Sequence, residues 1–136
     1  MGQYSLSMLE ADKLISAQVA DDVTRVIKAQ SLYKTGEFDK SIEECNIALT
    51  INPQNENAYM TRAYSYARKE DKVAALEDCK KAISINSKNP LVYQTQGDIL
   101  NLFKNHDEAL LSFRTYIQMK PDGIENVPEE YRSELR

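Results

Sequence analysis

The sequence predicts an all-α protein in which pairs of helices repeat as a solenoid. The first observation is a period of 34 residues, at which residues of the same kind return along the chain. Three sets that follow this period are Ile42, Leu76 and Leu110; Leu49, Ile83 and Ile117; and Asp21, Asn55 and Asn89. The second observation is that the last set consists of good helix N-caps. A fixed period of this length is typical of a solenoid built from one supersecondary unit.

Composition limits the classes of function. The chain has 136 residues, a net charge of −4 and 28% charged residues without a basic cluster, which argues against a nucleic-acid partner. The longest apolar runs are about four residues, far short of a membrane span. The two cysteines form no close pair and predict neither a disulfide framework nor a zinc site. We therefore expect a soluble, cytoplasmic protein with reduced thiols and no membrane partner.

Residues 2–21 resemble the second half of a repeat whose first half is missing. Subtracting 34 places Gly36 on Gly2, and Ser5 is a suitable helix cap. The apolar stripe of this helix is Met8, Ala11, Leu14 and Ile15. The half repeat suggests a fragment of a longer array, and an unrelated N-terminal helix is the alternative.

Three full repeats are expected after it, at residues 22–55, 56–89 and 90–123. Each contains a first helix and a returning helix, at 22–36 and 38–50, 56–69 and 73–84, and 91–103 and 108–119. Gly36 ends one helix, and the Asn52–Pro53 pair stops another. Pro90 suits a first helical turn, and Asp107 is expected to open the last returning helix.

The tail, residues 124–136, does not continue the repeat. Gly123, a helix stopper, stands at the register position that holds the N-caps of earlier repeats. Pro128, Glu129 and Glu130 favour the start of a short helix that ends near Arg136. This segment is a capping helix over the last apolar face, a frayed end, or the beginning of a longer parent.

The repeated residues resemble the tetratricopeptide repeat family, whose pattern is a small residue in the first helix and aromatic, Ala and Pro positions in and after the second. The matching residues are Ala29, Gly36, Phe38, Ala48 and Pro53; Tyr59, Ala63, Tyr66, Ala75 and Ala82; and Tyr93, Gly97, Ala109, Phe113 and Pro121. The resemblance covers residues 2–123 and implies a right-handed superhelical array of antiparallel helix pairs, with three full repeats and an N-terminal half repeat.

Some positions depart from the family pattern. Ser41 replaces Ala, Lys72 and His106 replace an aromatic residue, and Ser87 replaces Pro. Tyr116 is large where Ala is usual, which we interpret as a sign that fewer neighbours follow. These departures weaken individual joints without changing the predicted fold.

The residue pattern contains little that suggests catalysis, a cofactor or a metal. His106 is the only histidine and has no metal-ligand spacing around it, so we expect a packing or half-exposed role. Cys45 and Cys79 share one register position and are expected to be buried thiols. The acidic pairs at 43–44, 77–78 and 129–130 are expected on solvated outer helix faces. The chain is therefore predicted not to be an enzyme.

The resemblance implies a concave groove, lined by the first helices, that holds a peptide or helix of a protein partner. The family positions carried over to this chain are Val26, Gln30, Tyr33, Lys34, Asn57, Met60, Tyr64, Arg68, Gln94, Asp98 and Asn101. Such a face mixes apolar anchors with hydrogen-bonding groups. The alternative for Val26 and Met60 is packing against neighbouring helices. The predicted function is a protein-interaction module of a larger scaffold or adaptor protein.

Two other functions stay open. Chaperone-binding members of the family hold terminal carboxylates with Lys, Asn and Arg, and the matching positions here are Val26, Gln30, Thr61, Leu91 and Thr95, none of which is charged. A co-chaperone adaptor is therefore the alternative. Self-association is another, because a half repeat at the N-terminus would leave an apolar face for a second copy.

Overall fold

The computed structural model describes residue 8 and residues 21–136. These residues form α2 (Asp22–Lys34), α3 (Phe38–Ile51), α4 (Glu56–Arg68), α5 (Lys72–Ile85), α6 (Pro90–Leu102), α7 (His106–Met119), the 3₁₀ helix η1 (Pro121–Asn126) and α8 (Glu129–Leu135). No strand occurs among them, and the all-α prediction is confirmed. The half repeat predicted at residues 2–21 lies outside this described part, except for its residues 8 and 21.

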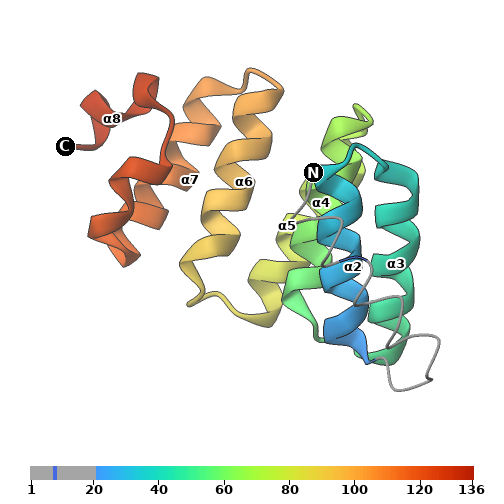
Figure 1. The fold of residues 1–136 in the computed structure, drawn as a ribbon. Coiled ribbons are helices and arrows are strands. Elements are labelled where there is room, and N and C mark those ends of the chain that lie inside the picture. The colour runs from blue at the N-terminus through green and yellow to red at the C-terminus, as the bar shows by residue number, and fades with distance from the viewer. Residues whose placement is uncertain (1–7, 9–20) are drawn as a thin grey trace.

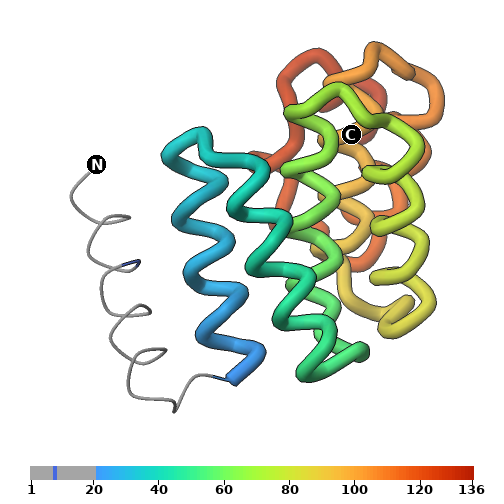
Figure 2. The backbone as a smooth tube through the Cα atoms, turned by 90° about the vertical axis from the view of Figure 1, so that its right-hand side faces the viewer, coloured from blue at the N-terminus to red at the C-terminus, as the bar shows by residue number. Residues whose placement is uncertain are grey.

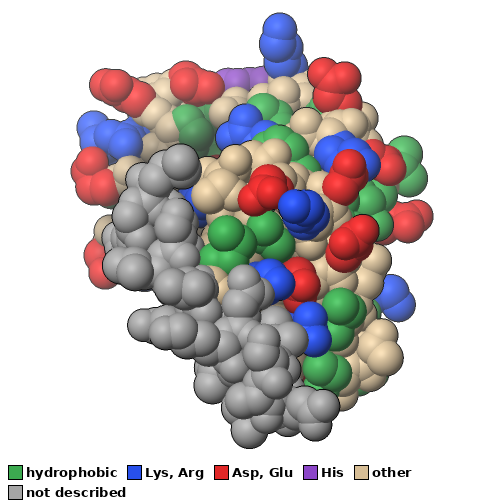
Figure 3. Space-filling model, turned by 45° about the vertical axis from the view of Figure 1, so that its right-hand side comes forward, with side chains coloured by type: hydrophobic (Ala, Val, Ile, Leu, Met, Phe, Trp, Pro, Cys, Tyr) green, Lys and Arg blue, Asp and Glu red, His purple; other side chains and the backbone are tan. Residues whose placement is uncertain are grey.

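The helices stack as antiparallel pairs, α2 with α3, α4 with α5, and α6 with α7 (Figure 1). Figure 2 shows the same pairs following one another along the array, with the C-terminal segment beyond the third pair. None of the described helices is long and apolar enough to cross a membrane. On the face drawn in Figure 3, basic and acidic side chains are interspersed rather than gathered by sign.

Polar side chains and one backbone conformation set the helix boundaries. The carboxylate of Asp71 accepts a hydrogen bond from the amide of Ala74 at 3.1 Å, and so caps α5. Asp107 does not open α7 as expected: it lies in the first turn, and the N-cap is Asn105, whose side chain makes no capping bond. A turn with positive φ separates the two helices of each pair. The residue there is Gly36 at 86°, Glu70 at 65° or Lys104 at 61°.

Asparagine side chains join successive pairs. The Oδ1 atom of Asn55 accepts from the amide of Ala58 at 3.1 Å, while its Nδ2 donates to Asp22 at 2.8 Å. Asn89 repeats this arrangement one period later: its Oδ1 accepts from the amide of Leu91 at 3.0 Å and its Nδ2 donates to Glu56 at 2.8 Å. One residue therefore caps the new helix and ties it to the preceding one.

Ser41, which stands where the family has Ala, is buried and hydrogen-bonded at the first joint. Its side chain is fully buried, and its hydroxyl donates to the carbonyl of Ala29 at 2.7 Å. The hydroxyl of Ser65, in the next helix pair, donates to the Ser41 hydroxyl at 3.0 Å. A buried hydroxyl that keeps its hydrogen bonds avoids the desolvation penalty of an unpaired one. The departure from Ala at this position is thus compensated by partners in both neighbouring helices.

Not all acidic side chains on the second helices are solvated, and the expectation was wrong for Asp78. This carboxylate is 4% exposed and receives two hydrogen bonds of 2.8 Å from the guanidinium of Arg62. Glu44, half-buried at the same register position, accepts from Arg25 at 2.9 Å and lies 3.5 Å from the ammonium of Lys28. These ion pairs link the first helix to the returning helix in the first and second pairs.

The C-terminal tail covers the outer face of α7. Tyr116, Val127 and Tyr131 are almost fully buried between the tail and that helix. The Tyr116 hydroxyl accepts from the Nδ2 of Asn126 at 3.1 Å, and the ring of Tyr131 stacks on His106 with centroids 4.5 Å apart. Tyr116 is therefore large because the tail packs on it. The tail, rather than another helix pair, packs on this residue.

Candidate functional site

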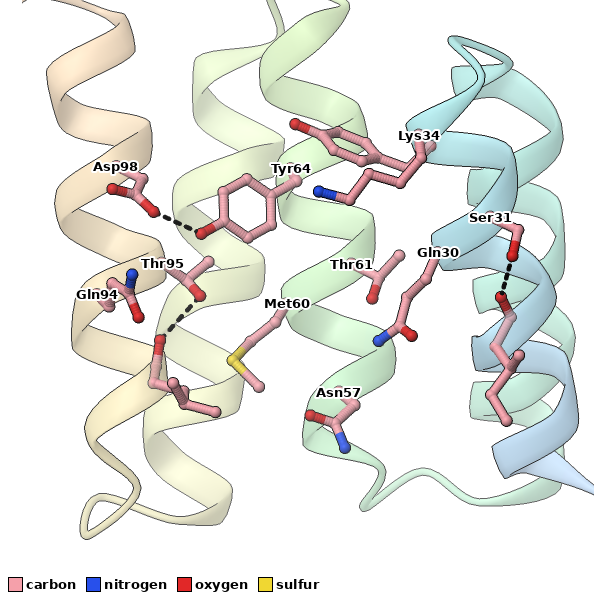
Figure 4. A pocket seen from close by; sticks show the side chains of 13 residues that line it. Gln30, Ser31, Lys34, Asn57, Met60, Thr61, Tyr64, Gln94, Thr95 and Asp98 are labelled. Atoms are coloured by element: carbon pink, nitrogen blue, oxygen red, sulfur yellow. Dashed lines mark hydrogen bonds between the residues drawn. The ribbon is translucent and has the colours of Figure 1, made fainter. Parts of the chain in front are cut away.

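A cavity of about 600 Å³ lies along the first helices of the three pairs, α2, α4 and α6 (Figure 4). Most of the groove residues expected from the sequence line it: Gln30, Tyr33, Lys34, Asn57, Met60, Tyr64, Gln94 and Asp98. Ile27, Ser31, Thr61, Leu91 and Thr95 complete the lining. We call this cavity, defined by these residues, the groove.

The groove repeats the 34-residue register of the chain. Gln30, Tyr64 and Asp98 occupy one register position on three successive first helices. Within each helix, lining residues recur three and four positions apart, as they must to share one helix face. The groove therefore exists because equivalent faces of three helices are stacked side by side.

Three of the predicted residues do not line the groove. Val26 is 4% exposed and packs in a core cluster with Ala48 and Ala58, so the packing alternative applies to it. The Nε of Arg68 donates to the Tyr33 hydroxyl at 3.2 Å, outside the lining. Asn101 accepts a hydrogen bond of 2.8 Å from the hydroxyl of Tyr131, which belongs to the tail.

Met60 shows that core packing and groove lining are compatible. Its side chain is 7% exposed and packs in a cluster with Ala82 and Val92, yet it also borders the groove. Figure 4 shows its thioether between α4 and α6. A flexible, polarisable side chain in that place suits an adaptable contact surface.

Ile27 and Ser31 are lining residues that the sequence analysis missed. Ile27 stands 34 positions before Thr61 and 68 before Thr95, so the register alone could have found it. Ser31 gives no such signal, because the equivalent residues are a buried serine and a buried isoleucine. Its hydroxyl donates to the carbonyl of Ile27 at 3.2 Å, a bond within its own helix.

The charged and phenolic groups of the groove interact across the helices. The hydroxyl of Tyr64 donates to Oδ2 of Asp98 at 2.7 Å, from α4 to α6. Burial raises the pKa of Asp98 to about 6. Burial, followed by the nearby charge of Asp98, also raises the pKa of Tyr64. Tyr33 packs against Tyr64 with ring centroids 5.8 Å apart, and the Lys34 ammonium lies 5.8 Å from the centre of the Tyr33 ring.

The thiols and the histidine lie outside the groove. Cys45 and Cys79 are buried, and burial raises the pKa of each thiol to about 12, so both stay protonated at neutral pH. His106 stacks on Tyr131 and lies 3.3 Å from a carboxylate oxygen of Glu134. Among the described residues, no group of three or more His, Cys, Asp or Glu is placed to hold a metal.

Comparison with known proteins agrees with this geometry. A family model described as "Tetratricopeptide repeat" matches residues 56–89. Residues 56–89 are thus similar to a tetratricopeptide repeat. No curated protein sequence matches it. A tetratricopeptide repeat protein of Thermus thermophilus, TTC0263, superposes with a TM-score of 0.84 at 18% identity, covering 98% of this chain and 75% of that one.

Two other solved tetratricopeptide repeat domains are similar to this chain. The first such domain of Spaghetti (RPAP3), bound to the HSP90 peptide SRMEEVD, matches with a TM-score of 0.74 at 21% identity, over 84% of this chain and 94% of that one. The corresponding domain of Arabidopsis OM64 matches with a TM-score of 0.72 at 23% identity, over 85% and 93% of the two chains.

Proposed function

We propose that this tetratricopeptide repeat array is a non-enzymatic protein-interaction module, which holds a peptide or a helix of a partner in the groove. The observation that carries the proposal is the preformed groove of about 600 Å³, which is lined by both apolar and polar side chains. Ile27, Met60 and Leu91 offer apolar contact, while Gln30, Asn57 and Gln94 offer amide hydrogen bonds. Because stacked helices hold these residues in place, the partner bears most of the ordering cost.

The comparisons support a peptide as the partner. The similar Spaghetti (RPAP3) domain is described in complex with a peptide, and a family model of the tetratricopeptide repeat describes residues 56–89 here. We further propose that the repeats divide the chain at residues 22–55, 56–89 and 90–123, with 2–21 a half repeat and 124–136 a capping tail. The module then serves a scaffold or adaptor protein of the cytoplasm.

A co-chaperone role is the second candidate, because that neighbour binds an HSP90 peptide. The groove gives it little electrostatic support. Gln30, Thr61, Leu91 and Thr95, the lining residues at the expected clamp positions, are uncharged. Lys34 is the one basic residue in the lining, and the lining also contains an aspartate. An acidic tail would therefore gain less electrostatic binding free energy here than in a groove that is lined by several cations.

A peptide array tests the proposal. The wild-type chain is compared with a Met60→Ala, Tyr64→Ala double variant and with a Val73→Ala, Leu111→Ala control, whose side chains are 71% and 61% exposed on returning helices. We expect the groove variant to lose about 30-fold in affinity or more, the equivalent of one hot-spot residue of about 2 kcal/mol, and the control to bind normally.

A second groove variant is needed because the first variant could lose binding simply by misfolding. Asn57 and Leu91 are exposed lining residues, so Asn57→Ala with Leu91→Ala alters the groove without opening the core. Circular dichroism of each variant is used to check that its helicity is kept. Peptide binding that survives both groove variants at full strength would contradict the proposal. Light scattering over a concentration series distinguishes the proposed function from self-association, because self-association predicts a mass that rises with concentration.

A further inference from the structure

We propose that the groove selects a partner segment with a basic side chain, lysine or arginine, between apolar residues, and that this cation binds the carboxylate of Asp98. This inference rests on the proposed function, because it names the partner chemistry of the same groove. The carrying observation is a carboxylate on the wall of the groove that pairs with no cation among the described residues. Figure 4 shows it facing Tyr64 across the space between α6 and α4.

Asp98 differs from Asp78, which is buried, and Glu44, which is half-buried, on the returning helices. Asp78 and Glu44 each pair with an arginine of the preceding helix. Asp98 accepts from the Tyr64 hydroxyl at 2.7 Å, and no described residue forms an ion pair with it. Ionised carboxylates away from water are normally paired, because an unpaired one pays a desolvation cost. Asp98 is thus an acidic group of the groove lining that has no cationic partner among residues 21–136.

The groups around Asp98 determine which kind of ligand group could pair with its carboxylate. The titratable groups that line the groove with it are Tyr64 on α4 and Tyr33 and Lys34 on α2. From α5 and α7, which pack against α6, no described charged group comes within ion-pair distance of Asp98. A ligand ammonium or guanidinium is therefore free to form a charge-assisted hydrogen bond with the carboxylate.

The residues next to Asp98 predict an apolar context for that cation. Leu91 and Met60 line the groove on the same two helices as Asp98 and Tyr64. The stem of a lysine or arginine buries well along such side chains while its charged head reaches the carboxylate. The Tyr64 ring adds a face on which a cation is attracted. A ligand carboxylate at the same place would instead meet a like charge.

Degenerate 12-residue peptides with a fixed central residue test the selection. The central residue is Lys, Arg, Gln, Met or Glu, the flanks are apolar and polar mixtures of equal composition, and fluorescence anisotropy measures affinity at pH 7.5. We expect the Lys and Arg pools to bind about 10-fold more tightly than the Met pool, because a charge-assisted bond is replaced by an apolar contact. The Glu pool is expected to bind most weakly.

A matched pair of variants assigns the preference to one carboxylate. Asp98→Asn keeps an oxygen for the Tyr64 hydroxyl and removes the charge, so the ratio of Lys-pool to Met-pool affinity should fall to about 1. Asp107→Asn removes the same charge from an exposed position on α7 and should keep the wild-type ratio. A ratio that survives Asp98→Asn would overturn the inference.

A pH series gives an independent readout. The Asp98 carboxyl, whose pKa is about 6 without ligand, must be ionised to bind a cation. Lys-pool affinity should therefore rise from pH 5 to pH 7.5, while the Met-pool affinity follows no such rise. Equal binding of all five pools would overturn the inference and leave the proposed function intact. Binding strongest for Glu would overturn it in favour of an acidic-tail site, and no binding of any pool would count against the proposed function itself.

Discussion

The second and third helix pairs have residues of different size at the equivalent positions where their two helices contact each other. In the second pair, Ala63 and Cys79 are both fully buried and belong to one cluster. In the third pair, the equivalent positions hold Gly97 and Phe113, and a Cβ atom added at Gly97 would lie 2.6 Å from the phenylalanine ring. In the third pair, therefore, the smaller Gly97 on the first helix makes room for the larger Phe113 on the returning helix.

What packs outside each pair explains the difference. The second pair is followed by another pair, and its Ala82 allows α6 to approach closely. The third pair is followed by the tail, and its large residues Phe113 and Tyr116 make one cluster with Tyr131. A register position thus specifies which neighbour a residue meets, whereas the size of the residue depends on what that neighbour is.

The largest expected effect comes from removing the tail's main anchor. Tyr131→Ala should lower the free energy of unfolding by about 3–5 kcal/mol, because a fully buried aromatic ring is lost from the cluster on α7. Urea unfolding followed by circular dichroism measures it. Tyr131→Phe is the control: it removes only the hydrogen bond to Asn101 and should cost about 1 kcal/mol. If both variants unfold like the wild type, the tail does not stabilise the third pair.

An intermediate effect is expected at the glycine of the third pair. Gly97→Ala should destabilise the fold by about 1–3 kcal/mol through overpacking against Phe113, despite the better helix propensity of alanine. Ala63→Gly, the reverse change in the second pair, should cost only about 1 kcal/mol because it opens little space. Thermal unfolding of the two variants compares them. A stabilised Gly97→Ala variant would show that the ring has room to move.

The smallest expected effect is a gain at the turn between paired helices. Glu70→Gly and Lys104→Gly should each stabilise the fold by about 1 kcal/mol, because both residues hold a left-handed backbone that glycine adopts without strain. Gly36→Ala, at the equivalent turn of the first pair, should cost a similar amount. Midpoints of urea unfolding report all three changes. A loss of stability in Glu70→Gly or Lys104→Gly, or a gain in Gly36→Ala, would mean that the left-handed backbone does not determine stability at these turns.

The sequence predicted the parts of the fold that depend on spacing alone. The helix pairs, the caps at Asn55 and Asn89 and most groove residues follow from the 34-residue period, because equivalent residues face equivalent neighbours. It did not predict the ion pair of Arg62 with Asp78, because periodicity says which face a residue lies on and not how closely two helices approach there. For the same reason the unpaired state of Asp98 became visible only once the helices were placed.

The tail was harder to predict because it lies outside the period. Pro128 and the two glutamates after it indicated a short helix, and α8 is found at Glu129–Leu135. Nothing in the local pattern showed that Tyr131 would contact His106 and Phe113, which are 25 and 18 positions away in the chain. Those contacts depend on the tail turning back over α7, a long-range feature that residue spacing does not encode.

The two buried thiols allow the opening of individual helix pairs to be measured by chemical labelling. Cys45 and Cys79 lie at the same depth in the first and second helix pairs, and the third pair has no cysteine there. Since a protonated, buried thiol reacts with an alkylating reagent only when its surroundings open, the labelling rate of each cysteine measures how often its own pair separates. Mass spectrometry of the two cysteine-containing peptides would then show, without any engineered cysteine, whether the array opens from one end or as a whole.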